Sequence, residues 1–140
     1  MEVFAYTRTE KATPESRRDK GYCVPGTGDP DGSIPSRWFC GASRDDVDHF
    51  LAQDLDMLVI SLPLTELTRN LISTKQFAIL SKKKTFLCNI ARGPHVDTQA
   101  LIQALETGQI RAAALDVTDP EPLPKGHPLW KAHNVFLVVD

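Results

Sequence analysis

The chain has 140 residues, which suits a single domain, and its 41% hydrophobic and 24% charged residues are ordinary for a soluble globular protein. A formal net charge of -2, with Lys82-Lys83-Lys84 as the one basic triplet, argues against a nucleic-acid partner or an anionic membrane surface. The sequence has no long apolar run, no signal-peptide pattern and no C-x-x-C pair among its three cysteines, so we expect a cytoplasmic protein without a membrane span or a metal site.

The first part of the chain combines one strand pattern with a long segment rich in proline and glycine. Val3-Phe4-Ala5-Tyr6 is short and apolar, as in a strand, and because domains rarely open with a core strand we expect a further segment upstream. From about residue 11 to residue 44 the chain carries four prolines and five glycines, which disfavour both helix and central strand. We therefore predict a Pro/Gly-rich insert at about 11–44, pinned to the core at its end by Trp38 and Phe39.

From residue 45 the sequence alternates between helical patterns and apolar runs of strand length. One helical pattern begins after Ser43 or Asp45, and later ones cover 71–80 and 98–107, the last with Asp97 as its cap and Gly108 as its stop. The apolar runs that predict strands lie at 57–60, 85–88, 112–117 and 135–138. Strands separated by helices predict right-handed βαβ units, hence an α/β fold with a parallel sheet and helices on both faces.

Three charged side chains follow predicted strands, at the edge where a parallel sheet binds its ligands. Arg92, followed by Gly93, has a planar guanidinium that can hold a carboxylate through two hydrogen bonds. Asp116 ends a strand of small residues, and Glu121 stands between two prolines, which limit its movement. Taken alone, each of these residues also suits an ordinary turn or an exposed loop.

The sequence around these residues resembles the D-isomer-specific 2-hydroxyacid dehydrogenase family. The resemblance is carried by Asn89-Ile90-Ala91-Arg92-Gly93-Pro94-His95-Val96-Asp97, Ala113-Ala114-Leu115-Asp116-Val117, Glu121-Pro122-Leu123-Pro124 and His127-Pro128-Leu129-Trp130. Leu62-Pro63-Leu64-Thr65 with Thr68 is similar to an earlier motif of the family, and the insert resembles its fungal branch. The segment from Asn89 to Val135 is the most specific part, because many positions match at fixed spacing.

The resemblance implies an oxidoreductase that moves a hydride between NAD or NADP and carbon 2 of a small 2-hydroxy or 2-oxo acid. It implies that Arg92 grips the substrate carboxylate and that Glu121 pairs with a catalytic histidine. The cofactor-binding residues that it implies are Asp116 near the nicotinamide carboxamide, Leu62, Pro63 and Thr68 on the adenine side, and Ile90, Ala91 and Arg92 near the nicotinamide ribose. The family dimerises through this domain, so a homodimer of the intact enzyme and an exposed apolar patch are expected.

Two parts of the family's machinery are absent from this sequence. The family holds the pyrophosphate on a G-x-G-x-x-G loop after its first strand, whereas Gly26-Thr27-Gly28 lies in the insert, outside any strand-to-helix turn. The strand at 3–6 is similar to the family's second strand, so we expect the first strand and the glycine-rich loop to be missing. Asp140 stands where the family has its catalytic histidine, and neither His127 nor His133 is placed to replace it. We therefore expect residues 1–140 to form a partial Rossmann-like NAD(P)-binding domain, truncated at both ends.

A third departure concerns the choice of cofactor. The family's second strand usually ends in an acid that binds the ribose 2′-hydroxyl, whereas this chain has Thr7 followed by Arg8. A guanidinium binds a 2′-phosphate well, so we expect NADP to be slightly favoured over NAD.

Three functions remain open from the sequence. The first is part of a dehydrogenase that is inactive by itself, the second is a non-catalytic dinucleotide-binding or protein-interaction module of the same fold, and the third is a translation product without function. The dehydrogenase hypothesis requires that Arg92, Asp116 and Glu121 converge at one rim of the sheet, beside the groove for the nicotinamide.

Overall fold

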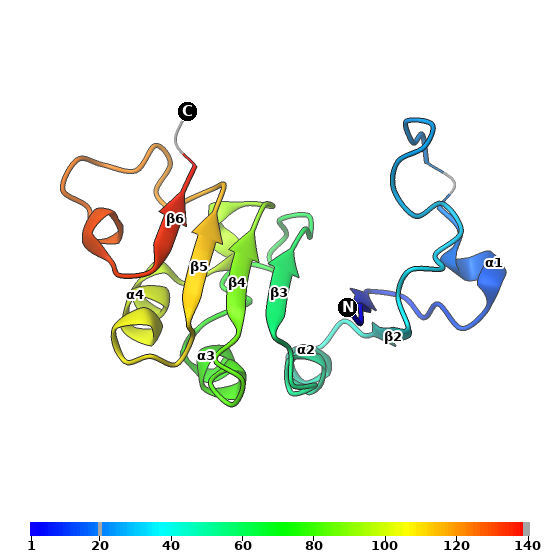
Figure 1. Cartoon of the computed structure of the whole chain (residues 1–140), viewed down its shortest axis with the longest axis horizontal. Coiled ribbons are helices and arrows are strands. Elements are labelled where there is room, and N and C mark those ends of the chain that lie inside the picture. The colour runs from blue at the N-terminus through cyan, green and yellow to red at the C-terminus, as the bar shows by residue number, and fades with distance from the viewer. Residues whose placement is uncertain (20, 139–140) are drawn as a thin grey trace. The chain divides into compact units, whose positions relative to one another are not determined.

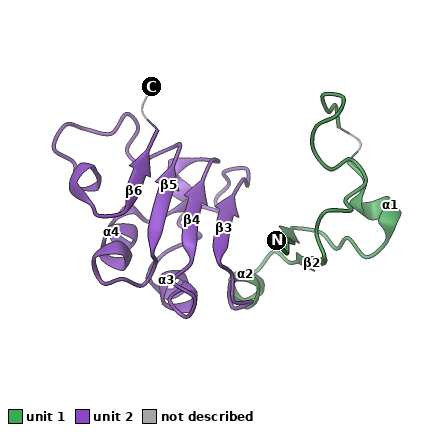
Figure 2. Cartoon of the chain, in the orientation of Figure 1, with its two compact units in different colours: residues 1–50 green, residues 51–140 purple. Residues whose placement is uncertain are grey.

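A computed structural model describes residues 1–19 and 21–138 (Figure 1). The chain divides into two compact units, residues 1–50 and residues 51–140 (Figure 2). No helix in the described part of the chain combines the length and the apolar character needed to cross a bilayer.

The first unit is built on two parallel strands. Its elements are β1 (Phe4–Thr7), α1 (Pro14–Arg17), β2 (Arg37–Cys40) and α2 (Arg44–Leu51), the last ending at the unit boundary. The strands pair from Phe4 with Arg37 to Thr7 with Cys40, so the expected first strand is confirmed within one residue. The prediction of irregular structure throughout 11–44 is wrong at two places, α1 and β2. Arg37-Trp38-Phe39-Cys40 is short and aromatic, and its backbone pairs with β1, a partner that a local pattern cannot reveal.

Helix α2 covers one face of this small sheet. Ser43 begins it, because the Asp46 N–H donates to the Ser43 hydroxyl at 3.1 Å while the Ser43 N–H donates to the Asp46 carboxylate at 3.0 Å. The ring of Phe50 lies 5.2 Å from that of Tyr6 and 5.3 Å from that of Phe39, in tilted and edge-on arrangements. The first unit therefore has an aromatic cluster as its core.

The second unit contains a four-stranded parallel sheet in the order β3-β4-β5-β6. Its elements are β3 (Met57–Ile60), α3 (Thr74–Leu80), β4 (Phe86–Asn89), the 3-10 turn η1 (Gly93–His95), α4 (Thr98–Glu106), β5 (Ala112–Leu115), the 3-10 turn η2 (Pro128–Lys131) and β6 (Val135–Leu137). The expected α/β fold and parallel strands are confirmed. The predicted cap is also confirmed, since the Asp97 carboxylate accepts the N–H groups of Gln99 and Ala100 at 3.1 Å each. Gly108 follows the end of α4 with φ +69, the left-handed conformation that glycine adopts without strain.

One face of the four-stranded sheet is buried and the other is open. Leu58 and Ile60 of β3 are buried, whereas Met57 and Val59 are 54% and 50% exposed. Phe136 of β6 continues the open face and is 65% exposed. Within this unit, α3 and α4 contact each other and lie on the buried face. The units β3-α3-β4 and β4-α4-β5 step in the same direction, and right-handed crossovers of the same direction place their helices on one face.

Candidate functional site

The strands of the second unit end together at one edge of the sheet. Ile60, Asn89 and Leu115 stand side by side in the register of β3, β4 and β5. The ladder continues one residue further, because the Ile90 N–H donates to the Ile60 carbonyl at 3.2 Å and the Asp116 N–H to the Asn89 carbonyl at 3.0 Å. The residues singled out after each strand therefore share one edge, as expected for a ligand-binding sheet.

The turn that carries Arg92 is held by a buried asparagine. Asn89 is 1% exposed, and its side-chain amide donates to the Arg92 carbonyl at 3.0 Å while its Oδ1 accepts the Ala91 N–H at 3.1 Å. The Arg92 side chain is exposed, and its Nη1 donates to the Ala91 carbonyl at 2.7 Å. Asn89 belongs to the family motif but had no predicted role, although an amide at the end of an apolar strand is a signal of such a turn.

Gly93 brings this turn against the loop that follows β5. A Cβ atom at Gly93 would collide with the carbonyl of Thr118 and would lie 2.7 Å from the amide nitrogen of Asp119. Only glycine permits this approach of two backbones. The Arg92 turn and the loop that carries Glu121 are consequently in direct contact.

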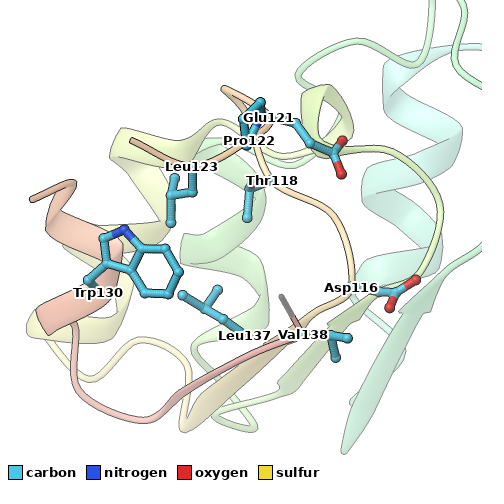
Figure 3. Close-up of a pocket in the computed structure, with 8 residues that line it drawn as sticks. All are labelled: Asp116, Thr118, Glu121, Pro122, Leu123, Trp130, Leu137 and Val138. Atoms are coloured by element: carbon cyan, nitrogen blue, oxygen red, sulfur yellow. The ribbon is translucent and has the colours of Figure 1, made fainter. Parts of the chain in front are cut away.

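Asp116 and Glu121 line one hollow of about 260 Å³. Figure 3 shows their carboxylates on one side of the hollow, while Leu123, Trp130 and Leu137 form an apolar wall on the other side. Both acids are exposed. The structure therefore brings these two predicted residues together. It places the turn of Arg92 against the adjoining loop, and Arg92 is not among the residues that line the hollow.

The residues expected on the adenine side lie in the loop after β3. The Thr68 hydroxyl donates to the Pro63 carbonyl at 2.9 Å and accepts the Thr65 N–H at 2.8 Å, so it stabilises the loop itself. Leu62 is partly buried and Pro63 is exposed beside it. On the neighbouring turn Ile90 is 53% exposed and Ala91 is buried, so only Ile90 of the two presents a side chain at this edge.

The remaining candidates lie elsewhere. Arg8 is exposed directly after β1, in the unit formed by residues 1–50. His127 accepts the Leu129 N–H at its Nδ1 at 3.2 Å and thereby caps η2, and His133 is exposed. Asp140 lies outside the described residues. Among the described residues, no group of three or more His, Cys, Asp or Glu side chains could hold a metal ion.

A comparison with family models finds a match over residues 35–139 to the model described as "D-isomer specific 2-hydroxyacid dehydrogenase, NAD binding domain". A glyoxylate/hydroxypyruvate reductase B of Yersinia enterocolitica is 49% identical over 98 residues, which are 70% of this chain and 29% of the reductase.

Solved structures agree with the sequence matches. The TT0316 protein of Thermus thermophilus has a TM-score of 0.71 at 32% identity, over 99% of this chain and 35% of its own. A D-isomer specific 2-hydroxyacid dehydrogenase of Xanthobacter autotrophicus, in complex with NADPH and MES, has a TM-score of 0.65 at 42% identity. The match covers 72% of this chain and 32% of that protein. The chain therefore spans about a third of the length of the proteins it matches.

Proposed function

The chain belongs to the D-isomer-specific 2-hydroxyacid dehydrogenase family, because it matches the model of that family's NAD-binding domain. We propose that it supplies the nicotinamide side of a site that reduces a small 2-oxo acid. The observation that carries the proposal is the contact of Gly93 with Thr118 and Asp119, which sets the Arg92 turn beside the hollow of Asp116 and Glu121. Three charged groups at one sheet edge suit a charged substrate and a polar cofactor.

Each charged residue has a defined task in this proposal. The Arg92 guanidinium holds the substrate carboxylate and stabilises negative charge that develops on the carbonyl oxygen. The Glu121 carboxylate orients a histidine supplied by a longer polypeptide and favours its charged form, which donates a proton to that oxygen. Asp116 accepts a hydrogen bond from the carboxamide. A bound NAD(P)H supplies the hydride.

The fit to a dinucleotide is partial, and we propose that the 140-residue chain by itself is inactive. The edge formed by Ile90, Arg92 and Asp116 fits the nicotinamide half. None of the eight glycines stands in a G-x-G-x-x-G sequence, so the pyrophosphate lacks the usual run of backbone donors.

A chimaera tests the proposal. Residues 35–138 would replace the matched segment of the Yersinia enterocolitica reductase, which provides the remaining parts. We expect NADPH-dependent reduction of glyoxylate or hydroxypyruvate by the chimaera and no measurable rate for the 140-residue chain. Arg92→Gln should lower kcat/KM by roughly 100-fold or more. Arg111→Gln is a matched control, because Arg111 lies away from this edge and donates to the Asp56 carbonyl. A folded but inactive chimaera, or an active Arg92→Gln variant, would refute the proposal.

The preference for NADP is proposed from Arg8, whose guanidinium suits a 2′-phosphate. The test is a second chimaera that contains residues 1–138. We expect Arg8→Asp to lower its NADPH-to-NADH ratio of kcat/KM by about tenfold, the effect of one charge-assisted contact. Arg18→Asp serves as the control, since Arg18 pairs with Asp31. Equal ratios before and after Arg8→Asp would end the idea.

We propose that the intact protein forms a homodimer through the open sheet face of Met57, Val59 and Phe136. The same exposed face favours the second candidate function, a protein-interaction module. Val59 on this face and Val24 in the insert are 50% and 56% exposed, which makes a matched pair. We expect Val59→Lys to weaken self-association in sedimentation experiments and Val24→Lys to leave it unchanged. The opposite result would assign association to another surface.

The cellular location and the branch of the family are also proposed from the sequence. We propose a cytoplasmic protein of the fungal branch, supported by the insert at 11–44 and by three cysteines that are all free thiols. Imaging of a fluorescently tagged full-length protein tests the location.

A further inference from the structure

A histidine that the proposed mechanism does not use is fully buried between the two loops of the site. His95 is 0% exposed and closes the short turn η1, three residues after Arg92. Its ring Nδ1 lies 2.9 Å from the Arg92 carbonyl oxygen, and its Nε2 lies 3.3 Å from the Pro63 carbonyl oxygen. Both nitrogens of one buried ring therefore face main-chain carbonyls, one after β4 and one after β3.

The chemistry of these neighbours fixes where the ring carries a proton. Carbonyl oxygens only accept hydrogen bonds, and a neutral imidazole has a single N–H. At 2.9 Å, an unprotonated Nδ1 would set two lone pairs against each other in a buried site, which is unfavourable. The proton therefore belongs on Nδ1, where it bonds the closer carbonyl.

With its proton on Nδ1, the ring donates to the Arg92 carbonyl and packs against the Pro63 carbonyl, so His95 lies between the two halves of the proposed cofactor site. The Arg92 carbonyl also accepts the Asn89 side-chain amide at 3.0 Å and the His95 main-chain N–H at 3.2 Å, so several donors restrain this peptide. The Pro63 carbonyl also accepts the Thr68 hydroxyl. The ring thus lies between the adenine-side loop and the turn that presents Arg92.

We propose that His95 is a positioning residue, whose Nδ1–H fixes the Arg92 carbonyl and whose ring spans the loops after β3 and β4. Its effect on cofactor binding rests on the proposed function, whereas its hold on the turn does not. A residue that merely fills the core would be replaced without loss by leucine, which has a similar volume. A positioning donor requires an N–H at the place of Nδ1.

The first measurement locates the ring proton by ¹⁵N NMR of the histidine side chains of the 140-residue chain. His95→Leu identifies the His95 signals among the four histidines. We expect a protonated Nδ1, and a ring protonated at Nε2 alone would overturn the proposal. This measurement needs no cofactor and uses the unaltered protein.

The second measurement compares variants by hydrogen exchange at the Ala91 amide, which is bonded to Asn89 inside the turn. His95→Leu should accelerate this exchange by about 3- to 10-fold, the effect of one lost hydrogen bond. His95→Asn should restore the rate, because its amide reaches the place of Nδ1, whereas His95→Gln carries its amide further out and should not. Urea unfolding of each variant separates local loosening from global destabilisation. Equal protection in the Leu and Asn variants would show that the ring only fills space.

An NADPH titration followed at the Ile90 and Ala91 amides separates this inference from the proposed function. We expect His95→Leu to weaken NADPH binding by about 3- to 10-fold, and His95→Asn to bind NADPH with an affinity within about twofold of that of the unaltered chain. If the unaltered chain shows no NADPH response while the proton position and the Asn rescue hold, the role of His95 in the turn stands and the cofactor-binding proposal for this chain fails. Unchanged NADPH affinity in His95→Leu would refute the effect on the cofactor.

Discussion

The two units of this chain differ in how much core they have. In residues 51–138 the buried apolar side chains run through β3, α3, β4, α4 and β5, whereas Phe50 is the one buried apolar residue described in the first unit. The first unit also holds buried polar atoms without a described partner, the Tyr6 hydroxyl and the Trp38 indole N–H. Burial raises the pKa of the Tyr6 hydroxyl, aided by the nearby Asp46 and Cys40.

The two units therefore differ in how far their own residues can stabilise them. A buried polar group without a partner costs about 1–3 kcal/mol, and about 50 residues rarely bury enough apolar surface to compensate. The second unit is thus expected to fold cooperatively, and the first to depend more on its surroundings.

The largest expected difference comes from aromatic truncation. Phe77 of α3 is 0% exposed, and Phe77→Ala should lower the free energy of unfolding by about 3–5 kcal/mol. Phe4 of β1 is only partly buried, so Phe4→Ala should cost about 1 kcal/mol or less in the same urea transition. Similar losses at the two sites would mean that the units share one cooperative core.

Glycine replacement gives the next effect. Gly93→Ala sets a methyl group against the Thr118 carbonyl, a backbone atom that cannot rotate away, and should cost about 3 kcal/mol. Gly26→Ala meets no atom within 4 Å and bears only the strain of φ +82, about 1–2 kcal/mol locally. Thermal unfolding of both variants measures the contrast, and a harmless Gly93→Ala would contradict the contact of the two loops.

Helix caps give a smaller contrast. Asp97 caps α4 and also accepts the Ser73 hydroxyl at 2.9 Å at the start of α3, so Asp97→Ala should cost about 1–2 kcal/mol. Thr13 caps α1, which has four residues and no buried side chain, so Thr13→Ala should change global stability by less than about 0.5 kcal/mol. Urea titrations measure both losses of unfolding free energy, and equal losses would contradict this prediction.

The smallest effect is a pH dependence with different salt sensitivity in the two units. The Ser43 hydroxyl lowers the pKa of Asp46, and the Lys82 ammonium, 2.7 Å away, lowers the pKa of Asp54, both from the usual 3.8. Because the folded pKa values are lowered, these carboxylates stabilise the fold above about pH 4 and lose that effect as the pH falls through the lowered values. Raising NaCl from 0.05 to about 1 M should move the Asp54 pKa back toward 3.8, since salt screens an exposed ion pair, and should move that of Asp46 less. An NMR titration of both carboxyl groups measures this, and an Asp46 pKa that moves as far as that of Asp54 would contradict it.

Elements with local signals could be predicted from the amino-acid sequence. The apolar run at 57–60 forms β3 with the same bounds, Asp97 caps α4, and the motif around Arg92 was enough to indicate the family. Periodicity, caps and fixed motif spacing act within a few residues, so they can be read along the chain.

Which segments meet could be seen only in the three-dimensional fold. It paired Arg37–Cys40 with β1, separated the strands into two sheets, left Val59 on an open face, and buried His95 between the carbonyls of Arg92 and Pro63. These outcomes depend on the direction of each crossover and on partners about 30 residues apart, and neither is encoded in a local pattern.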